Sequence, residues 1–365
     1  MKRRRILYLL NGLELGGAEN GLLTLHARGL FEGCDLRVAT LIGGRREMAD
    51  RFAAAGLAPT QFSTSPRMAL RHLALGGLQL AATIARWRPD VLILSLPQAN
   101  LVGRLIGRLL RTPTIIAFEH NAELAREAYV RLYRATAGCV DVVFADAPST
   151  LETVLQAHYH KPPRVARVAP LASFTAPPPL QPWPREPHFV AVGRLTSVKN
   201  HVAAIEAIAL LRARGVPARL TIFGEGPERP RLEALLAERQ LSEAVQLPGT
   251  RPRWWESGPF SGFVLTSRHE GLCIVALEAM WAGIPCVAPL IGGLKDYADP
   301  GAMIVLKGVD PESTAAGLLQ LLAEPAGALL RVEHARDRVM RLYGENVVAA
   351  QLAALNAELR DGFKA

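Results

Sequence analysis

The sequence contains few features that would place it outside the ordinary globular proteins. It has four cysteines in 365 residues and no Cys-x-x-Cys pair, which argues against a disulfide framework and a cysteine zinc site. We expect these cysteines to be small buried side chains in a reducing compartment. No uninterrupted apolar run approaches the roughly 18 residues that span a bilayer. The protein is therefore expected to be soluble, or to touch a membrane only from one side.

The amino terminus allows two interpretations. Its first ten residues place Lys and Arg before an apolar run, as a secretory signal does. Asn11, Gly12 and Glu14 interrupt that run, and no small-residue cleavage site follows. We therefore expect a first β-strand leading into a glycine loop, in a cytoplasmic protein.

The net positive charge is confined to one half of the chain. The 42 Lys+Arg exceed the 33 Asp+Glu, for a formal net charge of +9, while 50% of the residues are hydrophobic, too many for a disordered chain. Residues 1–176 hold 22 basic and 13 acidic side chains, whereas residues 177–365 hold 20 of each. The whole excess thus belongs to the first half and requires a local explanation.

Short β-rich apolar runs alternate with longer segments of helical period. The expected strands cover residues 6–10, 36–41, 91–94, 114–118, 140–145, 188–192, 219–223, 245–247, 262–265 and 285–288. The expected helices include residues 78–88, 101–110, 201–214, 229–239 and 345–360. This alternation predicts α/β domains whose parallel sheets are covered by helices on both faces.

The alternating pattern occurs twice, and a proline-rich segment separates the two copies. Residues 176–187 read Ala-Pro-Pro-Pro-Leu-Gln-Pro-Trp-Pro-Arg-Glu-Pro, which suits neither a helix nor a central strand. We expect a Rossmann-like domain over residues 1–175, a linker over 176–187 and a second such domain over 188–344. Residues 345–365 would form a helix that packs on either domain. Two doubly wound domains of this kind bind ligands at the carboxyl ends of their strands.

The strongest local signal is the segment 270–280, Glu-Gly-Leu-Cys-Ile-Val-Ala-Leu-Glu-Ala-Met, which follows a predicted strand. A helix beginning near Leu272 would direct free backbone N–H groups at an anion. Glu270 would precede that helix, and Glu278 would lie about two turns into it. Acidic side chains accept hydrogen bonds from sugar hydroxyls, although one capping and one solvated glutamate would produce the same pattern.

A second signal is Gly193-Arg194-Leu195, followed by Lys199, Asn200 and a predicted helix. A guanidinium binds phosphate bidentately and a lysine adds a mobile charge, so the pair suits a diphosphate. A solvated basic loop is the alternative.

Three weaker signals follow other predicted strands. Gly16 and Gly17 belong to a turn that lacks the Gly-x-Gly-x-x-Gly dinucleotide pattern but would allow close approach of a ligand. His120 stands in Glu-His-Asn, directly after the strand at 114–118. Residues 223–227, Phe-Gly-Glu-Gly-Pro, indicate a turn.

Together, in this order and over nearly the whole chain, these motifs resemble retaining glycosyltransferase family 4, also called the group 1 glycosyltransferases. The resemblance implies the GT-B fold, with two Rossmann-like domains facing across a cleft, the first for the acceptor and the second for the donor. It implies a metal-independent hexosyltransferase that retains the anomeric configuration, and the sequence contains no Asp-x-Asp that would indicate a metal. The implied donor is a nucleotide-diphosphate sugar, first a UDP-sugar and alternatively a GDP-sugar.

The resemblance also implies roles for the matching residues. Arg194 and Lys199 would hold the donor diphosphate, and Glu278 the ribose hydroxyls. Glu270 would hold the sugar hydroxyls or distal phosphate, and His120 would contact the donor sugar. The remaining implied binding positions are Gly16, Gly17, Gly271, Leu272, Cys273 and Ile274.

Two residues depart from the family pattern. Cys273 stands where the family often has glycine, which leaves the shape of the sugar pocket and a reactive-thiol role open. Asn200 also replaces a common glycine. Trp254 and Trp255 would flank the nucleotide base or pack in the core.

The basic first half carries the acceptor side in this plan. Arg104, Arg108 and Arg111 recur at helical spacing opposite leucines, and further basic residues are Arg67, Arg71, His72, Arg126, Arg131 and Arg134. Such a surface suits an anionic bilayer, or is simply solvated. Nucleic acid is not expected, because no helix-turn-helix, RRM or KH pattern occurs.

The expected function is transfer of a sugar to a lipid-linked or surface-polysaccharide acceptor at the cytoplasmic face of the cell membrane. Two alternatives stay open at this point. One is a sugar-nucleotide epimerase of the same fold, and the other is a catalytically inactive sugar-nucleotide-binding subunit.

Overall fold

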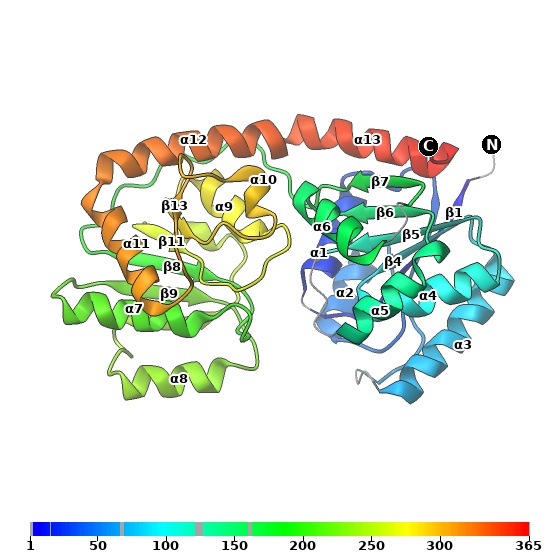
Figure 1. Ribbon diagram of the computed structural model, residues 1–365, viewed down its shortest axis with the longest axis horizontal. Coiled ribbons are helices and arrows are strands. Elements are labelled where there is room, and N and C mark those ends of the chain that lie inside the picture. Colours follow the sequence, from blue (N-terminus) through cyan, green and yellow to red (C-terminus); the bar gives the residue numbers. More distant parts are fainter. Residues whose placement is uncertain (1–2, 15, 66–68, 121–126, 160–162, 365) are drawn as a thin grey trace. The chain divides into compact units, whose positions relative to one another are not determined.

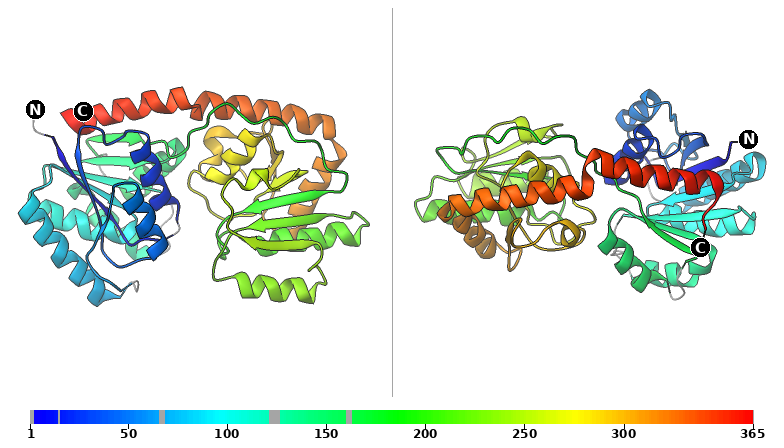
Figure 2. Two further views of the ribbon diagram at one scale, coloured as in Figure 1. Left: turned by 180° about the vertical axis from the view of Figure 1, so that it is seen from behind. Right: turned by 90° about the horizontal axis from the view of Figure 1, so that it is seen from above.

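The computed structural model describes residues 3–14, 16–65, 69–120, 127–159 and 163–364. Its contacts divide the chain into two units, the first comprising Met1–Ala172 and Asn346–Ala365 and the second Ser173–Glu345. Each unit is an α/β body with a parallel sheet and helices on both faces (Figure 1, Figure 2).

The first unit contains a seven-stranded sheet in the order β3-β2-β1-β4-β5-β6-β7. Its strands are β1 (Arg5–Leu10), β2 (Asp35–Thr40), β3 (Thr60–Gln61), β4 (Val91–Ser95), β5 (Thr114–Glu119), β6 (Val142–Ala145) and β7 (Val165–Val168). Its helices are α1 (Gly17–Ala27), α2 (Arg46–Ala54), α3 (Leu70–Trp87), α4 (Pro97–Leu109), α5 (Glu127–Ala135) and α6 (Pro148–His158). The chain order reverses direction across the sheet between β1 and β4, a switch point of the kind that binds ligands at strand carboxyl ends.

The second unit contains a six-stranded parallel sheet in the order β10-β9-β8-β11-β12-β13. Its strands are β8 (His188–Val192), β9 (Arg219–Phe223), β10 (Val245–Gly249), β11 (Gly262–Val264), β12 (Cys286–Ala288) and β13 (Ile304–Val305). Its helices are α7 (His201–Ala213), α8 (Arg229–Glu238), α9 (Ile274–Ala282), α10 (Leu294–Tyr297), α11 (Pro311–Ala323) and α12 (Pro325–Tyr343). Its switch point lies between β8 and β11.

Central strands are buried on both faces, which explains why they read as continuous apolar runs. Every residue of β4 is buried, as are the last five of β1. The ten predicted strands are all present, with shifts of one or two residues at some ends. Three strands, β3, β7 and β13, were not predicted because they contain only two to four residues and carry no clear apolar run. The helix expected near Leu272 begins at Ile274.

The last helix, α13 (Glu345–Asp361), packs on the first unit. Arg167 forms a bidentate ion pair with Glu358, with a closest distance of 2.7 Å, and Arg4 donates to the carbonyl of Leu359 at 3.0 Å. The aromatic rings of Phe144 and Phe363 lie 5.9 Å apart.

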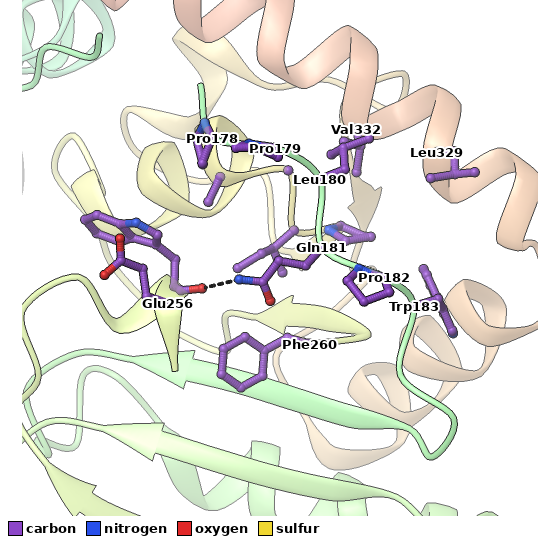
Figure 3. A pocket seen from close by; sticks show the side chains of 15 residues that line it. Pro178, Pro179, Leu180, Gln181, Pro182, Trp183, Glu256, Phe260, Leu329 and Val332 are labelled. Carbon is purple, nitrogen blue, oxygen red and sulfur yellow. Dashed lines mark hydrogen bonds between the residues drawn. The ribbon is translucent and has the colours of Figure 1, made fainter. Parts of the chain in front are cut away.

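The proline-rich segment expected as a linker packs along the second unit. Arg336 donates to the carbonyls of Pro178 at 2.6 Å and Ala282 at 3.0 Å, and Gln181 donates to the carbonyl of Trp255. Residues 178–183 thereby line a cavity of about 70 Å³ with Phe260 and residues of α9 and α12 (Figure 3). The partly buried Arg336 guanidinium thus satisfies a backbone carbonyl of a segment that belongs to no helix or strand.

No single helix among the described residues is long and apolar enough to cross a membrane. The bent pair α11 and α12, with an angle of 100° between its helices, passes that test only when the two are taken together.

Candidate functional site

The second unit holds a buried ion pair at the carboxyl ends of β8 and β11. Lys199 Nζ lies 2.6 and 2.8 Å from the two carboxylate oxygens of Glu270. The side chains are only 19% and 7% exposed. Such burial is stable only because each charge has the other as a close partner. Lys199 and Glu270, 71 residues apart in the sequence, are therefore brought together as expected for one site.

The loop carrying Lys199 is held by its neighbours in the fold. Lys199 N donates to the carbonyl of Thr196 at 3.1 Å, and Arg268 N donates to that of Val198 at 2.9 Å. A Cβ at Gly193 would lie 3.4 Å from the Lys199 side chain, so this glycine leaves the lysine its space. Arg194, in contrast, is exposed.

The Gly-x-Gly turn at 224–226 packs against this loop. A Cβ at Gly224 would lie 1.9 Å from the carbonyl oxygen of Gly193, and one at Gly226 would lie 2.3 Å from that of Leu195. No side chain fits in either place. The turn thus supports the backbone that carries Arg194, while Glu225 is exposed and paired with Arg229.

Both departures from the family glycines adopt a left-handed backbone. Asn200 precedes α7 with φ 53°, and Cys273 precedes α9 with φ 58°. Asn tolerates this conformation and here donates to the carbonyl of Val309 at 2.8 Å. Glycine is the residue that adopts this conformation at no cost, which explains the family preference at these two positions.

Neither of these residues caps its helix with a side-chain hydrogen bond. The positive dipole ends of α7 and α9 are therefore not covered by an N-cap side chain. Both helix amino termini follow closely in the chain on Lys199 and Glu270, and such termini bind anions. Ile274 is the first residue of α9, and Leu272 and Cys273 have their carbonyls bound by the buried Tyr297 hydroxyl at 3.0 Å.

Cys273 is buried, and burial raises the pKa of its thiol well above the ordinary value. A protonated thiol is a poor nucleophile, so the reactive-thiol interpretation is disfavoured. Gly271 accepts a hydrogen bond from Gly293 N at 2.7 Å. Gly292 approaches the Glu270 backbone so closely that a Cβ there would lie 2.0 Å from the carbonyl oxygen. The loop 270–273 is consequently fixed from behind by residues 292–297.

Glu278 lies one turn into α9 and accepts a hydrogen bond from the indole of Trp254 at 2.8 Å. Burial raises the pKa of this carboxyl to about 7, against the opposing effect of the indole bond. Trp254 is buried and packs on Phe263, so it is a core residue with a polar function rather than a ring free to stack on a base. Trp255 packs edge-on to Trp254.

The first unit places a second group of polar residues at the carboxyl ends of β4, β5 and β6. His120 Nε2 lies 2.8 Å from the hydroxyl of Ser95, and its Nδ1 lies 3.7 Å from Asp146 Oδ2. The His120 ring also contacts that of Phe118 at 4.4 Å between centroids. Burial raises the pKa of Asp146. His120 is therefore hydrogen-bonded through Nε2 to Ser95, and Asp146 lies beside Nδ1 beyond hydrogen-bond distance. Sequence reasoning missed both neighbours.

The glycines of the first loop have different roles. Gly16 precedes α1, and a Cβ there would lie 2.5 Å from a carboxylate oxygen of the buried Glu19, whereas Gly17 faces open space. Glu19 accepts from Glu14 N at 3.3 Å, and burial raises the pKa of its carboxyl. A buried acid behind the glycine turn was also not predicted. Glu19 lies in the first turn of α1, the helix that follows β1, whereas Ser95 ends β4 and Asp146 directly follows β6.

The expected basic stripe on residues 100–112 is wrong for Arg104. This side chain is fully buried, donates to Asn100 Oδ1 at 3.0 Å and lies 3.7 Å from Glu119. Its guanidinium also covers the ring of Tyr133 at 4.3 Å. The buried Glu119 carboxylate draws Arg104 inward, because an unpaired charge there would be costly.

Arg108, Arg111, Arg131 and Arg134 are exposed, as is Arg71 on α3. Leu15, Arg67, Asn121 and Arg126 lie outside the described residues. Within the part of the chain that the structure describes, no group of three or more His, Cys, Asp or Glu side chains could hold a metal ion.

Each half of the chain matches a different glycosyltransferase family model. Residues 4–171 match the model described as glycosyl transferase 4-like domain, and residues 178–338 match glycosyl transferases group 1.

Curated relatives resemble part of the chain. WcaL of Salmonella typhimurium, named for glycosyl transfer in colanic acid biosynthesis, is 31% identical over 184 residues, 46% of this chain and 44% of its own length. The D-inositol 3-phosphate glycosyltransferase of Corynebacterium urealyticum is 34% identical over 179 residues, 46% of this chain and 42% of its own length. The alignments thus span less than half the length of these relatives.

Among solved structures, HepE of Anabaena in complex with UDP-glucose superimposes with a TM-score of 0.77 at 16% identity, over 96% of this chain and 98% of its own. At this identity the likeness shows the fold, which is GT-B. With the two family matches, it supports a group 1, family 4-like glycosyltransferase.

Proposed function

We propose that the protein is a retaining glycosyltransferase that moves a sugar from a nucleotide-diphosphate donor to a lipid-linked or surface-polysaccharide acceptor at the cytoplasmic membrane face. The observation that carries this proposal is the buried Lys199–Glu270 pair beside two helix amino termini that no N-cap side chain covers. A cation and two positive dipole ends form an environment for a diphosphate.

Donor binding would use residues of the second unit. Lys199 and the exposed Arg194 neutralise the diphosphate, and the backbone at Gly271, Leu272, Cys273 and Ile274 donates to phosphate or sugar oxygens. Lys199 is already bonded to Glu270 without a donor. We infer that phosphate takes over Lys199, which frees the Glu270 carboxylate to accept from sugar hydroxyls.

Glu278 would accept from the ribose hydroxyls with the carboxylate oxygen that Trp254 leaves available. Because the pKa of Glu278 is about 7, ribose binding would favour the ionised form and draw that pKa down.

His120, oriented by Ser95 and Asp146, would contact the donor sugar, and Gly16 and Gly17 would allow phosphate or acceptor to approach the backbone. Transfer with retention is simplest by attack on the same face. The acceptor oxygen bonds to the anomeric carbon as the carbon–phosphate oxygen bond breaks, and the acceptor proton passes to the departing phosphate.

The donor and acceptor classes are supported by similarity. HepE was solved with UDP-glucose, which supports a UDP-sugar ahead of a GDP-sugar. WcaL is named for colanic acid biosynthesis, which supports a polysaccharide or its lipid-linked precursor as the acceptor.

Two assays test the proposal in sequence. A thermal-shift screen of UDP-, GDP- and ADP-sugars should show one donor class that raises Tm. That donor is then incubated with the protein alone and with lipid-linked glycan acceptors, and the product's anomeric configuration is read by proton NMR.

Transfer with retained configuration is expected. An inverted product would overturn the retaining assignment. Epimerised donor without an acceptor would favour the epimerase, and binding without turnover on any acceptor would favour the inactive subunit.

A further inference from the structure

Helices α3 and α4 have an unusual distribution of residue types between their inner and outer faces. Of fourteen large apolar residues described as exposed, six belong to α3, α4 and the residue after α4. They are Leu70, Leu75, Leu78, Leu105, Leu109 and Leu110. The two helices lie side by side in the first unit (Figure 1). We refer to these six leucines and the arginines beside them as the α3–α4 surface.

Glycines on the inner faces explain why the leucines point outward. On α3, a Cβ at Gly76 would lie 2.5 Å from the carbonyl oxygen of Leu41. On α4, a Cβ at Gly103 would lie 2.1 Å from Leu94, and one at Gly107 would lie 2.7 Å from Leu92. Both helices therefore approach the sheet too closely for large inward side chains at these positions. Leu78 and Leu109 are left 71% and 80% exposed.

Only basic charge surrounds these leucines on their own helices. Arg71 and Arg86 lie near the two ends of α3, and Arg108 and Arg111 near the end of α4. Neither helix contains an acidic residue. Between residues 62 and 118 the sequence holds seven arginines and one acid, Asp90, which accepts from the backbone of Arg5.

We infer that the α3–α4 surface docks on an anionic lipid bilayer, with its leucines in the acyl boundary and its arginines at the headgroups. This inference rests on the proposed function, in which the acceptor is presented at a membrane. Exposed leucines supply apolar area to bury, and exposed arginines supply attraction to anionic headgroups. Of these arginines, Arg108 also lies 3.7 Å from Asp141, which directly precedes β6. A second copy of the chain fits less well, because a self-complementary contact would bring arginine against arginine.

The α3–α4 surface carries part of the excess positive charge of the first half. Arg104 is buried in the core, so it is the exposed arginines Arg71, Arg86, Arg108 and Arg111 that face outward beside the leucines. The surface differs from a basic stripe opposite an apolar core face, because here the leucines and arginines are exposed together.

The test is flotation of the full chain with two kinds of vesicle, phosphatidylcholine alone and equal parts phosphatidylcholine and phosphatidylglycerol, at low and high salt. We expect binding to the anionic vesicles that weakens with salt. The double variant Leu78→Gln with Leu109→Gln should lower partitioning about a hundredfold, because each leucine side chain contributes about tenfold. Arg71→Gln with Arg111→Gln should lower it about tenfold.

The matched control is Leu329→Gln with Leu330→Gln, which replaces two exposed leucines on α12 of the second unit. This control should bind vesicles as the unmodified chain does. All variants replace exposed side chains, and their thermal unfolding confirms that each is folded.

Three outcomes would overturn the inference. The first is equal or negligible binding of the unmodified chain to both vesicles at low salt, and the second is a leucine variant that binds vesicles as well as the control does. The third is concentration-dependent self-association that only the leucine variant loses. Calorimetric UDP binding in solution separates this from the proposed function. A chain that binds UDP but no vesicles contradicts the docking surface alone, whereas vesicle binding without any nucleotide binding contradicts the proposed donor.

Discussion

The two units differ in how closely their buried charged groups are paired. In the second unit, Lys199 and Glu270 meet at 2.6 Å, so each charge already has a close partner. In the first unit, His120 Nδ1 and Asp146 lie 3.7 Å apart, as do Arg104 and Glu119, which is longer than a hydrogen bond. Burial raises the pKa of both carboxyls in the first unit. The second unit thus holds a close charge pair, and the first holds charged groups that lie farther apart.

This difference has a functional consequence. In the proposed donor site, a diphosphate would compete with Glu270 for Lys199, so donor binding would rearrange an existing pair. In the first unit, Ser95 bonds the imidazole of His120 and Asp146 lies beside it, so these groups would orient the ring rather than neutralise a phosphate. We expect variants of the second unit to change donor affinity and variants of the first unit to change turnover.

The largest effect should come from Lys199→Ala. It removes the cation from the diphosphate and leaves Glu270 buried and unpaired, so UDP affinity should fall about a hundredfold and stability by about 3 kcal/mol. Calorimetry and chemical denaturation measure the two effects. Lys307→Ala, at an exposed position in the same unit, is the control. Unchanged UDP affinity in both Lys199→Ala and Glu278→Ala would reject the donor site.

Asp146→Asn tests the other side of the comparison. It removes the carboxylate beside His120 Nδ1 and loosens the ring, so kcat should fall about tenfold to a hundredfold while UDP affinity stays unchanged. Steady-state kinetics across pH separates kcat from KM. Asp90→Asn, which changes a carboxylate away from His120, should keep its kcat. A kcat equal to that of the unmodified chain in Asp146→Asn would show that Asp146 does not position His120.

Glu278 gives the second unit a predicted pH dependence. Its pKa rises from 4.5 to about 7 on folding, so the folded state binds the extra proton between these values. Stability from this group is present below about pH 4.5 and is lost as pH rises through 7. Because the side chain is partly exposed, we expect a loss of about 2 kcal/mol. Chemical denaturation across pH measures the free energy of unfolding, which in Glu278→Gln should lack this part of the pH dependence. The same pH dependence in Glu278→Gln and the unmodified chain would contradict the prediction.

The smallest effect concerns the backbone that holds the second unit's pair. Asn200→Gly loses the bond to the Val309 carbonyl and adds chain entropy to the unfolded state, which should destabilise by about 1 kcal/mol. Cys273→Gly gains similar chain entropy but relieves a left-handed non-glycine residue, so its stability should stay within about 0.5 kcal/mol of the starting chain. Parallel thermal melts compare them. Equal destabilisation by both would mean that Cys273 is not strained.

Most of the fold was predictable because parallel strands that are buried on both faces appear in the sequence as continuous apolar runs. The apolar runs at β1 and β4 mark central strands, and Lys199, Glu270 and Glu278 stand near strand or helix ends where α/β proteins bind ligands. The short strands β3 and β13 show no such run, since two residues are too few to form an apolar run or a period.

Neighbours from distant segments were beyond sequence reasoning. Ser95, Glu19 and Asp146 are ordinary polar residues in the sequence, and only the order of β1, β4, β5 and β6 brings such residues to one sheet edge. Arg104 has the spacing of a surface stripe, yet the buried Glu119 draws it inward.

By itself, the sequence determined the doubled α/β pattern, the excess of basic residues in its first half and the residue types of the loops at 193–200 and 270–273. All three are properties of composition and spacing along the chain. Tertiary structure decided which charges are paired, which leucines of α3 and α4 face outward, and the left-handed backbone of Asn200 and Cys273. These depend on contacts between residues far apart in the chain, where the cost of an unpaired buried charge or a missing Cβ is set by the neighbours that folding supplies.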